Sequence, residues 1–466
     1  MELDRRVLAG IAVIVILSTV GGFVLLQREG EQPAPPSEQK EIVVITRHDS
    51  SIQKIFRDAF LASDYAKDHN ITGVRYIYTP PDYWRATIEH GGVDIAWGGG
   101  PTLFNQLIYL DLLQPMTGTE VMSEVNALPP SIGTALMRVN DDQGRPLWVA
   151  AAISSFGFTI NNVFLNRYNL STPVRWADLG SPELNREFPT IALAKPSLST
   201  SHTRTYTIIL QAFGWEAGWA LIRRIAANGR YYDGSVEAQT AVEGGEVGVS
   251  ISIDFYGYGS HLRNPDLEYV LPAGESIVNG DPIAIIKGTS YEEEAEAFTA
   301  FVLSLEGQTL WLDETLNRMP VRPDVFQTAK GRARVDLYEY YNLTTAGAGF
   351  DFNETEAGML EQSMRDFMES TMVDLHGELS SLWSAMVTKL RTGQISQARF
   401  DDLLAELSRP LSWSESNGTV LTFTKEYAMS INSRLLMDTS FALSMRLKWK
   451  NAAASRYDSV RAMLGA

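Results

Sequence analysis

The sequence predicts an α/β fold of two lobes, with an N-terminal transmembrane helix before it and a mainly helical C-terminal extension after it. Short apolar runs alternate with amphipathic helical patterns over about residues 42–328, which is typical of a mainly parallel sheet covered by helices. An uncharged stretch of 20 residues lies near the N-terminus. Beyond about residue 330 the strand signals fade and apolar residues recur at helical spacing.

The stretch from Val7 to Leu26 is long enough, as a helix, to cross the hydrocarbon layer of a bilayer. Arg5 and Arg6 precede it, so the positive-inside bias places the N-terminus in the cytoplasm and the bulk of the chain in an extracellular or periplasmic location. A cleaved secretory signal is the alternative. A single-pass anchor in the cell membrane is favoured because no small-residue cleavage site follows the run, which is longer than a usual signal core.

The rest of the pattern is read in chain order. The first lobe is expected to alternate the strands 41–46, 73–79 and 93–97 with helices that begin near Asp49, Pro81 and Pro101. The second is expected to hold the strands 147–154, 156–162, 190–194 and 247–253, with helices from about His202, Trp215 and Ser235. A strand at 282–288 and a long helix after it follow. The connections between the two lobes therefore cross.

These patterns divide the chain. The predicted parts are a membrane anchor or signal at 1–28, a proline-rich linker at 29–41, a first lobe at 42–153 with a return segment at about 281–330, a second lobe at 154–280, and a helical extension at 331–466. The methionine-rich apolar stripe of the extension is expected to be core filler rather than a groove for a partner. The extension is accordingly expected to be a buttress packed on one lobe, with a docking surface as the alternative.

Composition excludes several classes of function. A net charge of −17 repels phosphate backbones, which argues against nucleic acid as a partner. The absence of cysteine excludes disulfides, thiolate metal sites and cysteine nucleophiles. The chain carries no nucleotide-binding, zinc-protease, serine-hydrolase or EF-hand motif. No catalytic residue and no cofactor is therefore predicted, and the protein is not expected to be an enzyme.

Small polar residues gather in five turns, each after an apolar strand. One such turn is typical of a capped helix start. Five of them, at equivalent strand ends in two lobes, predict a polar cleft between the lobes. In "GGGPT" (98–102) the glycines permit close backbone approach, and the helix start offers unpaired N–H groups to an anion. The predicted ligand-binding residues are His48, Asp49, Ser50, Gly99, Gly100, Thr102, Ser154, Ser155, Ser199, Ser201, His202, Asp254 and Tyr256.

Four segments together resemble the extracellular solute-binding proteins of ferric-iron-type ABC importers. They are "VDIAWGGGPTLFNQLIYLDLLQPM" (93–116), "FGFTINNVFLNRYNLSTPVRWADL" (156–179), "GSVEAQTAVEGGEVGVSISIDFYGYG" (234–259) and "VNGDPIAIIKGTSYEEEAEAFTAFVLSLEGQTLW" (278–311). The likeness covers about residues 42–328 in the order of that family. It implies a hinged, bilobed periplasmic-binding-protein fold that closes on a solute and delivers it to an ABC permease and its ATPase. The membrane anchor would then keep the protein near its permease.

The resemblance leaves the solute open. In iron-binding members a histidine of the first turn and two adjacent tyrosines hold ferric iron; His48 and Tyr256 match two of these, whereas Phe255 stands at the first tyrosine. His48 and Tyr256 are metal ligands only if the solute is ferric iron. Other branches bind phosphorylated sugars, phosphonates or related small anions, which the hydroxyl-rich segment at 197–203 and Arg204 also suit. An extracellular ligand-sensing domain and an extracellular enzyme on the same scaffold are the alternative functions.

Overall fold

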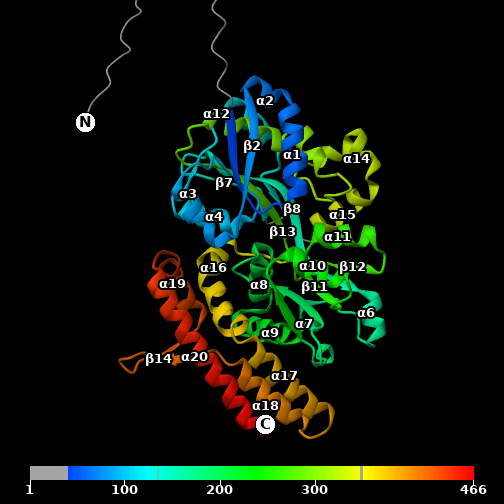
Figure 1. The fold of residues 1–466 in the computed structure, drawn as a ribbon, viewed down its shortest axis with the longest axis vertical. Helices are drawn as coiled ribbons and strands as arrows, with labels where there is room; N and C mark the ends of the chain where they lie inside the picture. The colour runs from blue at the N-terminus through cyan, green and yellow to red at the C-terminus, as the bar shows by residue number, and fades with distance from the viewer. Residues whose placement is uncertain (1–39, 134, 347–349, 466) are drawn as a thin grey trace, which may run out of the picture. The chain divides into compact units, whose positions relative to one another are not determined.

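The computed structural model describes residues 40–133, 135–346 and 350–465, and within these ranges an 11-stranded sheet extends through both lobes (Figure 1). Its strand order is β10-β9-β11-β8-β13-β3-β1-β2, with β4, β7 and β12 paired off this path. The predicted transmembrane segment and most of the predicted linker lie outside the described residues. Among the described residues, no helix is long and apolar enough to cross a membrane.

The first lobe surrounds a parallel core in which β1 pairs with β2 and β3. Its strands are β1 (Lys40–Thr46), β2 (Ile71–Tyr78), β3 (Ile95–Trp97), β4 (Leu113–Gln114), β7 (Arg138–Asn140) and the small hairpin β5 (Ser131–Ile132) and β6 (Ala135–Leu136). Its helices are α1 (Ser50–Ala62), α2 (Asp64–Asp68), η1 (Pro81–Tyr83), α3 (Trp84–His90), α4 (Pro101–Tyr109), α5 (Thr119–Ala127), α12 (Glu292–Leu303) and α13 (Leu305–Leu310). Three further helices, η3 (Pro323–Gln327), α14 (Ala329–Ala333) and α15 (Val335–Ala346), follow, and Leu337 of α15 joins the core of this lobe.

The second lobe is built in the same way. Its strands are β9 (Ile191–Ala194), β10 (Gly229–Tyr232), β11 (Val249–Ile253) and β12 (Leu267–Val270). Its helices are α6 (Asn162–Arg167), α7 (Trp176–Leu179), η2 (Pro182–Leu184), α8 (Thr200–Phe213), α9 (Trp215–Asn228), α10 (Ser235–Glu243) and α11 (Asp254–Arg263). β9 is parallel to β10 and β11, and β11 is antiparallel to β8.

Two neighbouring strands connect the lobes. β8 (Pro146–Asn161) is one continuous strand, and β13 (Val278–Ile286) runs antiparallel to it, with Val278 opposite Ser155 and Ile283 opposite Val149. The sequence predicts two strands here, separated near Ser155. The strand continues because Ser155 stays buried and extended, its N–H and hydroxyl both donating to Asp254 at 2.6 and 3.1 Å. The predicted lobe boundary at 153 and 154 thus falls inside a strand.

The chain beyond residue 350 is mainly helical. It contains α16 (Glu354–Met368), a π-helical segment η4 (Glu369–Val373), α17 (His376–Arg391), α18 (Gln397–Ser408), the hairpin β14 (Ser412–Ser414) and β15 (Val420–Thr422), α19 (Lys425–Met437) and α20 (Thr439–Leu464). Its apolar side chains join the core of the second lobe: Trp219 of α9 lies against Phe367 with ring centroids 5.0 Å apart, and Phe367 stacks on Phe423 at 3.8 Å. Met364 and Met368 are fully buried in this shared core.

Candidate functional site

A cavity of about 210 Å³ lies between the two lobes, at the carboxyl ends of several strands. The first lobe contributes the turns after β1 and β3 and the end of β2, and the second lobe contributes the loop before α8 and the starts of α10 and α11. Residues of the connecting strands β8 and β13 form part of the lining. Glu361 of α16 completes it. The cavity is therefore lined by elements from both lobes and from the C-terminal part.

The N-termini of α4, α8 and α10 lie at this cavity. α4, α8 and α10 each place their first residues in its lining, and each has at least nine residues. The first backbone N–H groups of a helix have no partner within the helix, and they carry the positive end of its dipole. Neither α4 nor α10 has a side-chain cap, so these groups remain available to a ligand. Convergent helix N-termini of this kind suit an anion.

The glycines before α4 have a second role. Gly98, Gly99 and Gly100 have φ values of +78°, +113° and +85°, which other residues rarely adopt. The N–H groups of Gly99 and Gly100 donate to the Asp281 carboxylate at 2.9 and 3.3 Å. A Cβ at Gly98 would lie 2.7 Å from Nε2 of His48. The glycine run thus binds Asp281 and gives His48 the space that it occupies. The N–H groups at the start of α4 remain for a ligand.

Hydroxyl groups cluster on the side of the second lobe. Ser235 Oγ lies 2.7 Å from Ser199 Oγ and 2.8 Å from Ser201 Oγ. His202 Nδ1 lies 3.1 Å from Ser199 Oγ and 3.3 Å from Ser235 Oγ. Burial lowers the pKa of His202 to about 3, so the imidazole is neutral. The cluster offers hydrogen bonds without adding charge.

Two arginines of the lining connect the lobes. Arg47, after β1, donates to the carbonyl oxygens of Thr79 and Leu198, both at 3.0 Å, and no carboxylate within the described residues forms an ion pair with it. Arg204 of α8 donates to Thr102 Oγ1 at 3.2 Å and forms a two-pronged ion pair with Glu354 of α16. Arg47 thus lies at the cavity with no carboxylate of the described residues in direct contact, over the ring of Tyr78 at 4.7 Å, whereas Arg204 is paired with Glu354.

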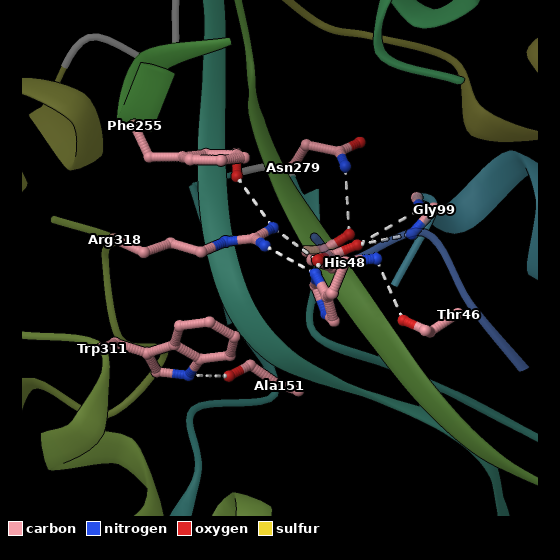
Figure 2. A network of polar contacts seen from close by, with 12 residues as sticks. Thr46, His48, Gly99, Ala151, Phe255, Asn279, Trp311 and Arg318 are labelled. Carbon is pink, nitrogen blue, oxygen red and sulfur yellow. Dashed lines mark hydrogen bonds and ion pairs between the residues drawn. The ribbon is translucent and has the colours of Figure 1, made fainter. Parts of the chain in front are cut away.

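A buried ion pair lies at the junction of the connecting strands (Figure 2). Arg318 bonds the Asp281 carboxylate through Nη2 and donates through Nη1 to His48 Nδ1 at 3.1 Å. Its guanidinium lies between the rings of Phe255 and Trp311, 4.5 and 5.1 Å from their centroids. Flat aromatic faces stabilise a guanidinium in this arrangement. The guanidinium thus contacts Asp281, His48 and two aromatic rings, whereas its Nε is buried without a hydrogen-bond partner among the described residues.

This network fixes the state of His48. Burial lowers the pKa of His48 to about 3, the Arg318 charge acts in the same direction, and Asp281 opposes them. The ring is consequently neutral at pH 7. Since Nδ1 accepts from Arg318, Nε2 carries the proton. A histidine in this tautomer, with an arginine at its free nitrogen, is not arranged to bind a metal.

The remaining residues of an iron site do not fit either. Phe255, at the position of the first tyrosine, has no donor oxygen and covers Arg318 instead. Burial raises the pKa of Tyr256, with Asp49 and Tyr78 acting in the same direction, which disfavours the phenolate that a ferric ion requires. Within the part of the chain that the structure describes, no three acidic or histidine side chains are grouped to hold a metal ion.

The structure places nine of the thirteen sequence-predicted residues in the cavity lining. These are His48, Asp49, Gly99, Gly100, Thr102, Ser154, Ser199, Ser201 and Tyr256. The other four lie outside it. Ser50 is exposed on the first turn of α1, and His202 lies buried behind the hydroxyl cluster. Ser155 of β8 and Asp254 at the start of α11 bond each other and are both buried.

Several lining residues were not predicted. Arg47 directly precedes His48 after the first predicted strand, and Ser235 opens a predicted helix, so these positions were a usable signal. Asp281 follows a glycine in the return strand and carried a weaker signal. Arg318 and Glu361 gave none, because both come from segments that the strand-and-turn pattern does not connect to the cleft. The other unpredicted polar residues of the lining include Tyr78, Asp233, Glu237 and Asn279.

Comparisons with known proteins agree with this architecture. A family model described as bacterial extracellular solute-binding protein matches residues 93–340. The phosphoglycerate transport regulatory protein PgtC of Salmonella typhimurium is 29% identical over 178 residues, 38% of this chain and 43% of PgtC. The match therefore spans less than half the length of that curated relative.

Two solved structures share the fold. The periplasmic binding protein AfuA from Actinobacillus pleuropneumoniae, with fructose-6-phosphate bound, superposes with a TM-score of 0.54 at 18% identity, over 66% of this chain and 99% of AfuA. Iron-bound HitA from Pseudomonas aeruginosa gives a TM-score of 0.51 at 18% identity, over 69% of this chain and 98% of HitA. The predicted bilobed periplasmic-binding-protein fold is confirmed. Since the family model matches more than half of the chain, the protein belongs to the bacterial extracellular solute-binding proteins, a family of binding proteins rather than of enzymes.

Proposed function

We propose that this protein is the solute-binding component of an ABC importer and that its solute is a small organic anion carrying a phosphate or phosphonate group. The observation that carries the proposal is the convergence of the N-termini of α4, α8 and α10 on one cavity between two lobes. Arg47 and the hydroxyl cluster lie in the same lining. Backbone N–H groups, hydroxyls and an arginine are the groups that bind phosphate in proteins.

The choice of an organic phosphate over ferric iron rests on the junction of the connecting strands. A cation, Arg318, contacts the histidine that an iron site would use, and a ferric ion there would be repelled. Two relatives support the choice: AfuA is described with fructose-6-phosphate bound, and PgtC is named for phosphoglycerate transport. A cavity of about 210 Å³ is smaller than the usual pockets for drug-sized ligands, as expected for a short phosphorylated compound.

The proposal includes delivery to a membrane permease. Arg47 bonds Thr79 of the first lobe and Leu198 of the second, so the lobes are held closed over the cavity, in the arrangement in which binding proteins retain their solute. The apolar segment from Val7 to Leu26 would tether the protein to the membrane surface and raise its effective concentration at the permease.

The test is a calorimetric titration of the full chain with fructose 6-phosphate, fructose, inorganic phosphate and ferric citrate. Fructose 6-phosphate is expected to bind and to raise the melting temperature, because a ligand that prefers the folded state stabilises it. Fructose and ferric citrate are expected not to bind. Arg47→Met should weaken fructose 6-phosphate binding about tenfold or more, since a charge-assisted hydrogen bond contributes about 1.5–3 kcal/mol.

Arg75→Met is the control, since Arg75 lies exposed in the same lobe and pairs with Glu41. This variant should bind like the wild type. Binding of ferric citrate, or equal binding of fructose and fructose 6-phosphate, would overturn the proposed solute class. Sustained product formation from the bound compound would overturn the assignment as a binding component.

A further inference from the structure

One wall of the cavity comes from a helix beyond the region that the family model matches. The match ends at residue 340, whereas α16 begins at Glu354. α16 packs against α4 of the first lobe and α8 of the second (Figure 1). It thus lies where the N-termini of two of the three convergent helices meet.

Four charged residues of the α16–η4 segment face the lobes. Glu354, Glu361, Arg365 and Glu369 are spaced by 7, 4 and 4 residues, which places them on one helical face. Glu354 pairs with Arg204, and Glu369 Oε1 accepts from the backbone N–H of Ser197 at 2.9 Å. Arg365 pairs with Asp82 of the first lobe.

Glu361 is the member of this stripe that lines the cavity. Its residue is 4% exposed, and its Oε1 lies 3.9 Å from Nη1 of Arg365. Burial raises the pKa of Glu361 to about 7, with Glu354 acting in the same direction and Arg204 and a hydrogen bond with Thr102 opposing it. A large part of this side chain is therefore the neutral acid near pH 7.

The charged groups around Glu361 come from several elements. α8 contributes Arg204, and α4 contributes no acidic or basic side chain. The helices α19 and α20 also pack against α16, but Lys425 pairs with Glu356 and Arg446 with Asp366. The other charged groups of the cavity lining are Arg47, Asp49, Asp233, Glu237, Asp281 and Arg318.

We propose that Glu361 contacts the solute and determines its specificity, by hydrogen bonding an uncharged, hydroxyl-bearing end of the molecule whose phosphate lies at the helix N-termini. This inference rests on the proposed function. A neutral carboxylic acid both donates and accepts a hydrogen bond, as does a sugar hydroxyl. If the solute carried a second anionic group next to Glu361, either that group and Glu361 would both have to be protonated, or the two negative charges would repel each other. The site therefore selects hydroxylated monophosphates against phosphates that also carry a carboxylate.

The experiment compares fructose 6-phosphate, 3-phosphoglycerate and inorganic phosphate by calorimetry on the full chain at pH 6 and pH 8. The wild type should bind fructose 6-phosphate more tightly than 3-phosphoglycerate. Glu361→Leu should lower the affinity for fructose 6-phosphate about tenfold, the effect of one lost hydrogen bond and an unpaired ligand hydroxyl. At pH 6, where Glu361 is largely neutral, it should leave the affinity for inorganic phosphate within about twofold, because that ligand lacks the hydroxyl-bearing end that Glu361 contacts.

Glu361→Gln gives a second readout that does not depend on Glu361→Leu folding. Glutamine keeps the size and the hydrogen bonds but cannot ionise. Wild-type affinity for fructose 6-phosphate should fall between pH 6 and pH 8 relative to that of Glu361→Gln, because ionised Glu361 repels the phosphate. Glu356→Gln, on the same helix but paired with Lys425, should follow the wild type.

The outcomes separate the two proposals. If the wild type binds none of the three phosphates, the proposed solute class is wrong. If the wild type binds fructose 6-phosphate and both Glu361 variants bind it with wild-type affinity and pH dependence, the role of Glu361 is wrong and the solute class stands.

Discussion

Arg318 and Asp281 form their ion pair almost out of contact with water, with side chains 4% and 8% exposed. Such a pair contributes little net stability when intact, because desolvation offsets the attraction between the charges. Removing one partner leaves the other charge buried and is strongly destabilising. At this position the pair has a second effect: it places a fixed cation beside His48 and so determines which solutes the junction tolerates.

Arg318→Met is expected to lower the free energy of unfolding by about 3–5 kcal/mol, as measured by urea denaturation. The double variant Arg318→Met/Asp281→Asn should recover much of that loss, because no charge then remains buried. Lys54→Ala, which breaks the exposed pair with Asp58, should change the free energy by less than about 1 kcal/mol. A loss in Arg318→Met as small as that in Lys54→Ala would contradict the buried-charge argument.

Only some of the residues that line the cavity could be predicted from the sequence. Local signals were sufficient for Thr102 and Ser199, because each lies where an apolar strand gives way to a helix start. Arg318 and Glu361 carry no such mark. Both reach the cavity through long-range packing, which a pattern along the chain does not encode.

Among the elements, α16 differs most from the expectation. Met364 and Met368 were predicted to be core and are buried, whereas Met359, predicted to join the same stripe, is 48% exposed. The charged stripe that contacts both lobes lies on the face next to the buried methionines. A single helix thus has an apolar face that follows the second lobe and a polar face that meets the cavity. The pairing of Glu354 with Arg204 is the part of this arrangement that most directly affects an anionic solute.

Glu354→Gln should release the positive charge of Arg204 toward the cavity and raise the affinity for fructose 6-phosphate several-fold. It should also lower the free energy of unfolding by about 1–3 kcal/mol, because Arg204, with a side chain 5% exposed, loses its carboxylate. Glu356→Gln is the matched control: the two glutamates are 24% and 23% exposed, but the partner of Glu356, Lys425, is 37% exposed. Calorimetry measures the affinity and urea denaturation the free energy of unfolding. If Glu354→Gln and Glu356→Gln gave the same affinity and the same free energy, this prediction would be contradicted.

The presence of the strands was easier to predict than the positions at which they begin and end. Continuous apolar runs identified β1, β3 and β11 because parallel strands are buried on both faces. β8 was divided wrongly because two consecutive serines resemble a turn. The N–H and hydroxyl groups of Ser155 donate to Asp254, a residue 99 positions away in the chain, and Ser154 Oγ accepts from Arg318. Local sequence reasoning cannot detect such distant partners.

At the scale of the whole molecule, four buried titratable groups have opposing effects on how the free energy of unfolding changes with pH. Burial raises the pKa of Asp254 and of Glu361 to about 7, so the folded protein holds protons that the unfolded chain releases above about pH 4. Their stabilising contribution is complete at low pH and is lost as pH rises through about 7. Burial lowers the pKa of His48 and of His202 to about 3, so their contribution is complete above about pH 6.5 and is lost as pH falls.

Between about pH 4.5 and 6.5 the effect of the two acids on the free energy of unfolding should therefore offset that of the two histidines. Removing one acid or one histidine should leave a net change of this free energy with pH. Relative to the wild type, Asp254→Asn should gain stability as pH rises from 5 to 7, with a slope of up to about 1.4 kcal/mol per pH unit. His202→Asn should gain relative stability as pH falls over the same range. Urea denaturation at pH 5, 6 and 7 measures both, with Asp458→Asn, an exposed carboxyl, as control. Parallel pH profiles for all variants would contradict the balance.

The two-lobed fold itself was predictable because it follows from alternating strands and helices in a fixed order, and the ordered likeness to known binding proteins reinforced it. The C-terminal helices were expected to pack on one lobe, with a docking surface as the alternative. Which lobe they pack on was not predicted, since an apolar stripe indicates burial without saying against what.

The composition of the two cores has a consequence for how the chain acquires its structure during synthesis. The core of the first lobe draws on residues from Ile42 to Tyr341, and that of the second lobe on residues from Phe158 to Leu464. Neither core can be completed until its last residues, Tyr341 for the first lobe and Leu464 for the second, have been synthesised. The nascent chain therefore exposes apolar strands during most of its translation. Such long-range closure makes folding slow and leaves the unfinished chain dependent on protection from aggregation.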